Sequence, residues 1–313
     1  MNKEHSLQGG MGRRIAGEYK TELSMLAIFA VFFVVLSCAS PYFLTTQNIM
    51  NVMSQVSSTA LLAIGMTIVI ITSGLPRKPG QTRLELAQVN VNILKDITPQ
   101  IVRVAPKAIY IIVSNPVDVL TYVFHKISGL PEHQIIGSGT ILDTSRLQSA
   151  LAKRFFISPK NVHAHVYGEH GDSSFVPWSL VHIANNHVNV YKDSSPDRDR
   201  ITWKGEEEYE AIEQFVKTSG GQVIKAKGAT FYAVAMSVCH LCKCVMSTAG
   251  TALTVSTMMH GEYGVEDVCL STLALVDTTG VRGKIMNHLT DEEVSKLQNS
   301  ANKLKEVISQ ITY

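Results

Sequence analysis

The sequence has 313 residues, with 28 Lys and Arg against 26 Asp and Glu and a net charge of +2. A chain of this length can hold two domains and a sizeable core, and its nearly balanced charge gives no reason to expect nucleic acid as a partner. Its five cysteines predict no disulfide framework.

An apolar run at 23–38 follows a polar segment with four basic residues, which are Lys3, Arg13, Arg14 and Lys20. Positive charge before an apolar run predicts a membrane helix with its N-terminus inside the cell. The run is slightly shorter than the roughly 20 residues that a spanning helix needs, and residues 41–43 extend it into the interface. A signal peptide without a convincing cleavage site and a core helix are the alternatives.

Beyond residue 75 the pattern becomes α/β. Helical spacing at 84–94 and 117–127 alternates with short apolar runs at 108–113 and 134–137, as in a buried parallel sheet. A second domain follows, with predicted strands at 163–167, 182–191, 251–258 and 267–275 and predicted helices at 206–218, 226–245 and 290–311.

The helix predicted at 226–245 contains the letters CHLCKC, which bring His240 close to Cys239, Cys242 and Cys244. A finger or ribbon site needs a second pair of ligands at a matching spacing, and the sequence has none. We therefore expect free thiols on a helix and no metal.

The stretch GEHGDSSFVPWS, residues 168–179, places His170 between carboxylates and beside glycines that permit a tight turn. Upstream, GSGTILDTSR at 137–146 holds Asp143 and Arg146 three residues apart, on one face of a helix. A carboxylate can orient a histidine, and a guanidinium can grip a carboxylate substrate. The alternatives are a polar surface loop and a surface helix pair worth a few tenths of a kcal/mol.

Together with SNPVDVLTY at 114–122, RKPGQTRLEL at 77–86 and KGATFYA at 227–233, these segments resemble the L-lactate dehydrogenases of the lactate/malate dehydrogenase superfamily, from about Ile70 to the C-terminus. The resemblance implies that His170 exchanges a proton with the substrate and that Asp143 orients it and raises its pKa. It also implies that Arg146 binds the substrate carboxylate and that Arg83, on a mobile loop, polarises the carbonyl.

The same resemblance implies NAD as the cofactor, contacted by Asn115 and Ser138, with Asn115 also reaching the substrate. Two residues bear on the substrate and disagree. Arg77 stands where an arginine marks malate enzymes, whereas Thr230 stands where lactate enzymes carry threonine. The residues of the longer segments at 168–179 and 114–122 resemble those of lactate enzymes and favour lactate as the substrate. Malate dehydrogenase is the alternative.

Regulation is a further point of departure from the family. Many bacterial relatives bind fructose 1,6-bisphosphate through an arginine and a histidine. His163 is in place, but Gln148 stands where the arginine is expected, which argues against this activation because a bidentate phosphate donor is lost.

Residues 19–74 resemble the first membrane segments of ribose-type sugar ABC-transporter permeases. The short motif at 66–74 resembles both these permeases and the lactate dehydrogenases. We therefore hypothesise that two unrelated reading frames were joined there. The glycine-rich G-x-G-x-x-G loop and the first three strands of the dinucleotide-binding sheet are not recognisable, so an exposed sheet edge and impaired turnover are expected.

The predicted architecture is a permease-like apolar helical segment at 1–65, a truncated Rossmann half-sheet at 66–138 and an α+β catalytic domain at 139–313. The expected reaction interconverts lactate and pyruvate with NAD, in a cytoplasmic homo-tetramer that contacts the membrane through residues 23–74. The alternatives are a malate dehydrogenase, a membrane fragment of a sugar permease and a non-functional chimera.

Overall fold

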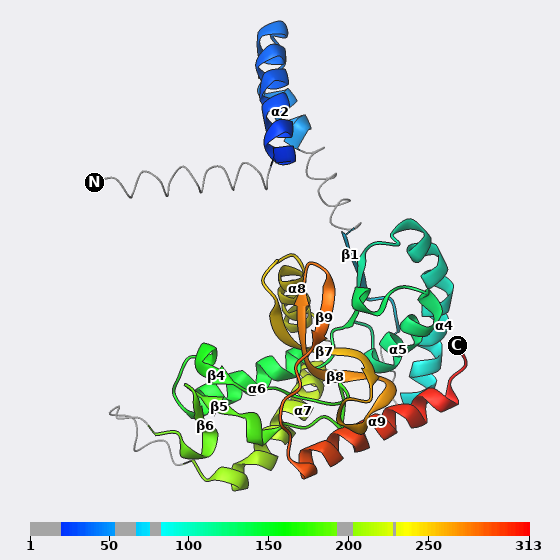
Figure 1. Ribbon diagram of the computed structural model, residues 1–313, viewed down its shortest axis with the longest axis vertical. Helices are drawn as coiled ribbons and strands as arrows, with labels where there is room; N and C mark the ends of the chain where they lie inside the picture. Colours follow the sequence, from blue (N-terminus) through cyan, green and yellow to red (C-terminus); the bar gives the residue numbers. More distant parts are fainter. Residues whose placement is uncertain (1–19, 54–66, 76–82, 193–202, 228–229) are drawn as a thin grey trace. The chain divides into compact units, whose positions relative to one another are not determined.

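The computed structural model describes residues 20–53, 67–75, 83–192, 203–227 and 230–313. The chain forms two compact units, Met1–Ile64 and Gly65–Tyr313, which are shown in Figure 1. The prediction at Arg77 lies outside the described residues, whereas the segment at 66–74 is described from residue 67 onward and contains the first strand.

The described part of the first unit contains helix α2 (Lys20–Ala39) and a helical segment at 46–53. Phe33 packs edge-on against Phe43 at 5.4 Å between ring centroids, but most described apolar side chains of α2 are exposed. Within the described part of the chain no helix has the length and apolar character that crossing a membrane requires. The predicted membrane helix at 23–38 is therefore not supported, because the apolar run falls short of the roughly 20 residues needed.

The second unit is built on a six-stranded sheet with the order β1-β2-β3-β7-β8-β9. The first three strands, β1 (Ile68–Ile71), β2 (Ile109–Ile112) and β3 (Ile135–Gly137), are parallel. The other three, β7 (Thr251–His260), β8 (Glu266–Asp277) and β9 (Gly280–Lys284), are antiparallel. β3 joins the two parts by pairing with β7. Among the described residues β1 and β9 are the two edge strands.

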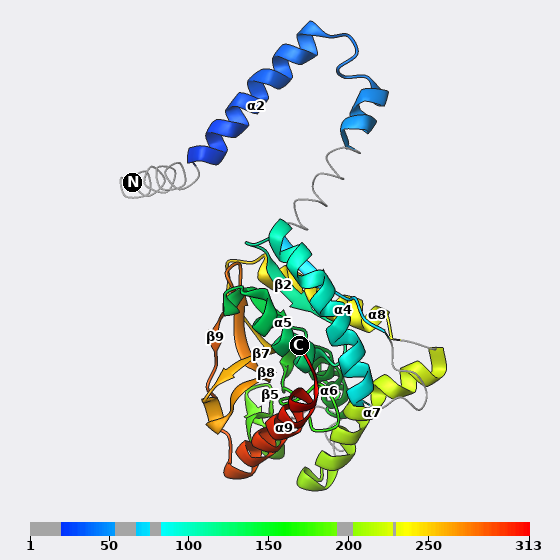
Figure 2. The same ribbon diagram turned by 90° about the vertical axis from the view of Figure 1, so that its right-hand side faces the viewer.

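Strands β2 and β3 are buried on both faces, as their continuous apolar letters predict, whereas Ile70 of β1 is exposed. Tyr110 and Ile112 belong to a core with helices α4 (Arg83–Val104), α5 (Val117–Ser128) and α9 (Asp291–Gln310). Ile109 and Ile111 point to the other face, in a core shared with helix α8 (Tyr232–Val245). Figure 2 shows α4 and α9 on the same side of the sheet. The alternation follows from the two-residue period of a strand.

A smaller lobe packs helices α6 (Ile141–Arg154) and α7 (Tyr209–Lys227) against the three-stranded sheet of β4 (Val162–His163), β5 (His182–Ile183) and β6 (Asn186–His187). Trp178 stacks on Tyr209 with ring centroids 3.9 Å apart. This lobe and the main sheet meet at the start of α6. Six short 3-10 turns complete the described part, at Glu132–Gln134, Pro159–Asn161, Trp178–Leu180, Val188–Val190, Gly205–Glu208 and Glu262–Gly264.

Most predicted elements are found close to their expected positions, and three are corrected. The strand predicted at 182–191 is broken, because Ala184 and Asn185 adopt left-handed backbone angles (φ 46° and 67°) and make a hairpin between β5 and β6. The strand predicted at 163–167 is reduced to β4 and an isolated bridge between Tyr167 and Phe175. The helix predicted at 226–245 begins only at Tyr232.

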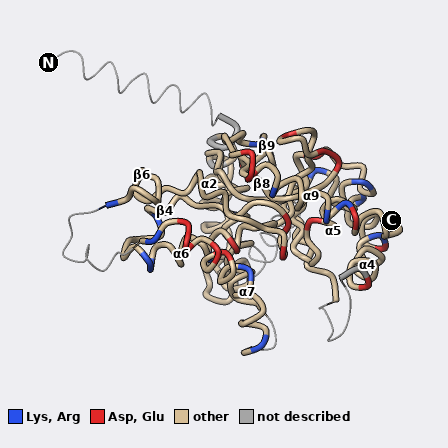
Figure 3. Tube along the Cα trace, turned by 90° about the horizontal axis from the view of Figure 1, so that it is seen from below, with Lys and Arg blue, Asp and Glu red and all other residues tan. Residues whose placement is uncertain are grey.

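Charged residues of both signs are interspersed over the described chain, as Figure 3 shows. On α8 the three cysteines of CHLCKC are free thiols. His240 Nε2 and Cys244 Sγ lie 3.8 Å apart. Within the described ranges no group of three or more His, Cys, Asp or Glu is arranged to hold a metal ion.

Candidate active site

The loop that carries His170 is fixed to the main sheet. Gly168 exchanges two backbone hydrogen bonds with Ser271 of β8, at 2.9 and 3.0 Å. Gly168 has φ 93°, and a Cβ added to it would lie 2.8 Å from Ser300 Oγ of α9. Only glycine fits this combination of backbone angle and close approach. The next backbone N–H, that of Glu169, donates to Ser300 Oγ at 2.8 Å.

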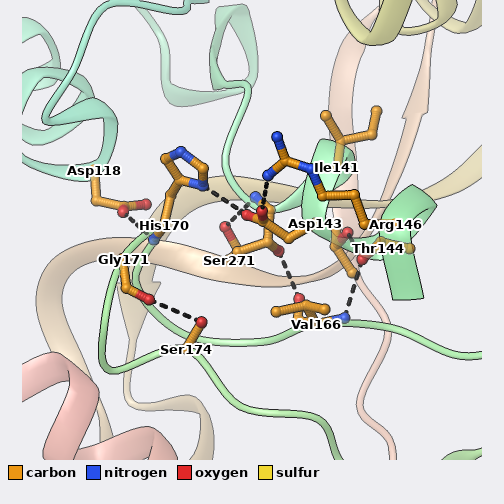
Figure 4. A network of polar contacts seen from close by, with 12 residues as sticks. Asp118, Ile141, Asp143, Thr144, Arg146, Val166, His170, Gly171, Ser174 and Ser271 are labelled. Carbon is orange, nitrogen blue, oxygen red and sulfur yellow. Dashed lines mark hydrogen bonds and ion pairs between the residues drawn. The ribbon is translucent and has the colours of Figure 1, made fainter. Parts of the chain in front are cut away.

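His170 and Asp143, predicted from separate segments, are in direct contact. The Nδ1 atom of His170 lies 2.6 Å from Asp143 Oδ2, and Arg146 Nη1 donates to Asp143 Oδ1 at 2.9 Å. Asp143 is 6% exposed in the first turn of α6. Figure 4 shows the second ring nitrogen of His170 directed away from Asp143. The carboxylate thus fixes one ring nitrogen and leaves the other to face a reactant.

Hydroxyl groups tie the start of α6 to Val166, in the segment before His170. Thr140 Oγ1 donates to the carbonyl of Val166 at 2.5 Å, and Thr144 Oγ1 accepts from the backbone N–H of Val166 at 3.0 Å. Thr144 also shares a 2.8 Å hydrogen bond with Thr254 of β7. These buried contacts hold Asp143 at a constant distance from the histidine loop.

The charges around His170 favour its protonated form. Burial lowers the pKa of His170, but the carboxylates of Asp143 and Asp118 outweigh it and raise the pKa to about 9. Burial likewise raises the pKa of Asp143, but His170 and Arg146 hold it below its usual value. Asp143 therefore stays ionised while His170 carries a proton at neutral pH.

Asp118 belongs to this site, although the sequence-based prediction did not include it. Its Oδ2 atom accepts a 2.7 Å hydrogen bond from the backbone N–H of His170, and the residue is 2% exposed. Burial raises the pKa of Asp118 to about 6, while its contacts with Ser256 and His170 oppose the rise. The sequence signal that could have identified Asp118 was a carboxylate in the first turn of a helix that directly follows a buried parallel strand.

Asn115 and Ser138 follow two neighbouring parallel strands, β2 and β3, at their carboxyl ends. Asn115 is exposed and its carbonyl accepts from Asn90 Nδ2 at 2.7 Å. Ser138 is half-buried and its backbone N–H donates to Ile112 at 2.8 Å. Ligands of open α/β sheets bind at this edge, so the structure brings the two predicted cofactor residues to one edge.

The remaining predicted residues are less completely described. Thr230 is half-buried in the link between α7 and α8. Arg83 is the first residue of α4, and its side chain lies outside the described part. Gln148 Nε2 donates to the carbonyl of Ala164 at 3.1 Å, directly beside His163, which is exposed on β4.

Comparisons with known proteins identify one family. The family model "lactate/malate dehydrogenase, alpha/beta C-terminal domain" matches residues 140–313, and "lactate/malate dehydrogenase, NAD binding domain" matches residues 43–137. The second match includes residues 43–65, which the sequence analysis assigned to a permease-like segment. The hypothesis of a permease fusion gains no support from these matches.

Individual relatives agree with the family models. L-lactate dehydrogenase 1 of Clostridium acetobutylicum is 43% identical over 247 residues, which cover 79% of this chain and 77% of the relative. The L-lactate dehydrogenase of Thermoanaerobacterium saccharolyticum is 41% identical over 79% of this chain and 78% of its own length.

Solved structures show the same likeness in three dimensions. A ligand-bound minor L-lactate dehydrogenase from Enterococcus mundtii has a TM-score of 0.73 and 32% identity, over 79% of this chain and 76% of that one. The L-lactate dehydrogenase of Clostridium thermocellum has a TM-score of 0.69 and 36% identity, over 79% of this chain and 78% of that one.

Proposed function

Because this chain belongs to the lactate/malate dehydrogenase family, we propose that it interconverts L-lactate and pyruvate. Membership makes it an NAD-dependent oxidoreductase. The observation that carries the proposal is the continuous contact from His170 through Asp143 to Arg146. This contact connects a proton donor, His170, to a cation, Arg146, that can bind the carboxylate of a substrate.

His170 acts as the acid and base of the proposed reaction. Asp143 occupies Nδ1, so the proton that is exchanged is the one on Nε2. In pyruvate reduction the Nε2 proton moves to the carbonyl oxygen, and in lactate oxidation the neutral ring takes the hydroxyl proton. A positioned group of this kind contributes about 100- to 10,000-fold to the rate.

Arg146 binds the substrate carboxylate in this proposal. Its side chain is 17% exposed and uses Nη1 to contact Asp143, which aligns the guanidinium. A planar guanidinium grips a carboxylate with two parallel hydrogen bonds. Arg83, at the start of α4, is proposed from the sequence resemblance to polarise the substrate carbonyl.

The described residues fit the nicotinamide end of NAD. The loops after β1 and β2 are tied together, because Ser114 Oγ donates to the carbonyl of Ser73 at 2.7 Å. Ser73 Oγ is itself buried without a hydrogen-bond partner among the described atoms, at the edge where Asn115 and Ser138 lie. We propose that Asn115 and Ser138 hold the nicotinamide end. When bound, NAD accepts a hydride from lactate and NADH returns it to pyruvate.

Reduced turnover was expected because the sequence lacks a glycine-rich phosphate loop. The comparisons do not support this expectation, and it stays a prediction. The division into a dinucleotide-binding part at 66–138 and a catalytic part at 139–313 is likewise our proposal, as are a cytoplasmic location and a homo-tetramer. Light scattering coupled to size exclusion measures the assembly directly.

Malate dehydrogenase remains the second candidate because of Arg77. Following NADH consumption with pyruvate and with oxaloacetate separates the two. A higher kcat/KM for pyruvate is expected, and a strong preference for oxaloacetate would overturn the lactate assignment. The Arg77→Gln variant serves as the matched comparison, since removing a second guanidinium is expected to weaken only the substrate with a second carboxylate.

A further inference from the structure

We propose that Asp118 is a second positioning residue for His170, which holds the backbone of its loop and supplies the negative charge that pairs with its protonated ring. The proposal rests on the proposed function in that His170 is taken as the acid and base. Figure 4 shows Asp118 on the other side of His170 from Asp143. The two carboxylates come from different helices, α5 and α6.

The first support is geometric. The 2.7 Å hydrogen bond from the His170 N–H to Asp118 Oδ2 fixes the main chain at the histidine itself. Asp118 is in the first turn of α5, where the free N–H groups of a helix favour a negative charge. The loop is thus held at Gly168 by β8, at Glu169 by α9 and at His170 by α5.

The second support is the cost of burying this carboxylate. Asp118 Oδ1 is buried and makes no hydrogen bond to the described atoms, and the same is true of Ser256 Oγ. The Ser256 hydroxyl nevertheless lies close enough to lower the pKa of Asp118. A half-satisfied buried carboxylate destabilises a fold relative to an apolar residue of similar size. A role at His170 accounts for a charge that packing alone disfavours.

The third support is the charge balance of the site. Asp143 is shared between His170 and Arg146. Among the described residues Asp118 forms no ion pair with a lysine or an arginine. The two carboxylates therefore balance Arg146 only when His170 is protonated as well.

The other groups that face this pair are few. Glu169, on the loop of His170, raises the pKa of Asp118, and His170 lowers it. The buried thiol of Cys269 on β8 also senses the charge of Asp118. Arg146 lowers the pKa of His170 from the α6 side. Asp118 thus opposes the effect of Arg146 and keeps a proton available on the ring for transfer to a carbonyl oxygen.

The decisive experiment measures the pKa of His170 itself, without turnover. The full chain is labelled with ¹³C-histidine and titrated by NMR as wild type, Asp118→Asn and Asp96→Asn, and the His170→Gln variant identifies the signal. Asp96 is an exposed carboxylate on α4, so its variant loses the same charge far from the loop. We expect Asp118→Asn to lower the pKa of His170 by about half a unit or more, and Asp96→Asn to leave it unchanged.

Coincident titration curves for wild type and Asp118→Asn would overturn the proposal. If Asp118→Asn does not fold, the NMR titration curve of His170 in the wild type tests the proposal instead. A second inflection of the His170 signal near pH 6, the value to which burial raises the pKa of Asp118, supports the proposal, and a single-step curve contradicts it. Absence of pyruvate turnover in the wild type would count against the proposed function and leave this measurement intact.

In an active enzyme, the kinetic readout follows from the same shift. The pH at which kcat/KM for pyruvate falls on the alkaline side should move to lower pH in Asp118→Asn, by the shift seen in NMR. A residue that only stabilised the loop would lower the rate at every pH without moving this limb. If neither the alkaline limb of the pH profile nor the pKa of His170 measured by NMR changes in Asp118→Asn, Asp118 has only a structural role.

Discussion

His170 Nδ1 and Asp143 Oδ2 lie 2.6 Å apart although 27 residues separate them in the chain. The contact exists because β3 delivers α6 to the same place to which β8 clamps the histidine loop. It is the shortest link in the proposed mechanism, and four predictions follow from it and from its surroundings.

Replacing Asp143 by Asn should reduce kcat/KM for pyruvate by about 100-fold or more, because the ring loses both its orientation and its ionic partner. The pKa of His170 should fall as well, since Asp143 raises it. Steady-state kinetics across pH measure both effects. Asp96→Asn is the control, and a variant as active as that control would remove Asp143 from the mechanism.

Replacing Arg146 by Lys should raise KM for pyruvate by about 10- to 100-fold, since one charge-assisted hydrogen bond contributes roughly 1.5–3 kcal/mol. The lysine keeps the positive charge but lacks the planar guanidinium that forms two parallel hydrogen bonds. Initial-rate kinetics with pyruvate provide the measurement. An unchanged KM would show that the substrate carboxylate binds elsewhere.

Gly168→Ala should destabilise the fold by about 1–3 kcal/mol, because the backbone has φ 93° and the added Cβ would come 2.8 Å from Ser300 Oγ. The loss of stability should exceed that of Gly129→Ala. Gly129 also has a positive φ of 66° but has nothing within 4 Å, so it reports backbone strain alone. Urea unfolding of both variants tests the difference, and equal losses would contradict the role of the close approach.

Stability should decrease with rising pH through the titration of His170. Its pKa in the folded chain, about 9, is higher than its ordinary value of 6.5, so folding favours the protonated ring. The contribution is complete below pH 6.5 and is lost as the pH rises through 9. Denaturant midpoints of wild type and His170→Gln should converge over this interval. A constant difference from pH 6 to pH 10 would show that the folded pKa is not raised.

The extent of sequence-based prediction differs between elements for physical reasons. α5 and β2 were found near their predicted positions because apolar periodicity records burial directly, whereas α4 begins as predicted but continues past 94 to Val104. The single strand predicted at 182–191 was wrong because Ala184 and Asn185 adopt left-handed backbone angles without a glycine to mark the turn. β9 escaped prediction because Gly280 and Gly283 interrupt its apolar pattern.

By itself the sequence determined the candidate groups, because His170, Asp143 and Arg146 lie in short segments that resemble those of the lactate/malate dehydrogenases. Only the tertiary structure decided how their charges are distributed. Asp118 looks like one more acid at a helix start, and its burial and its hydrogen bond to the His170 N–H depend on three helices and a strand packing around one loop. A pKa depends on distance and solvation, and both are set by the folded chain rather than by neighbours in sequence.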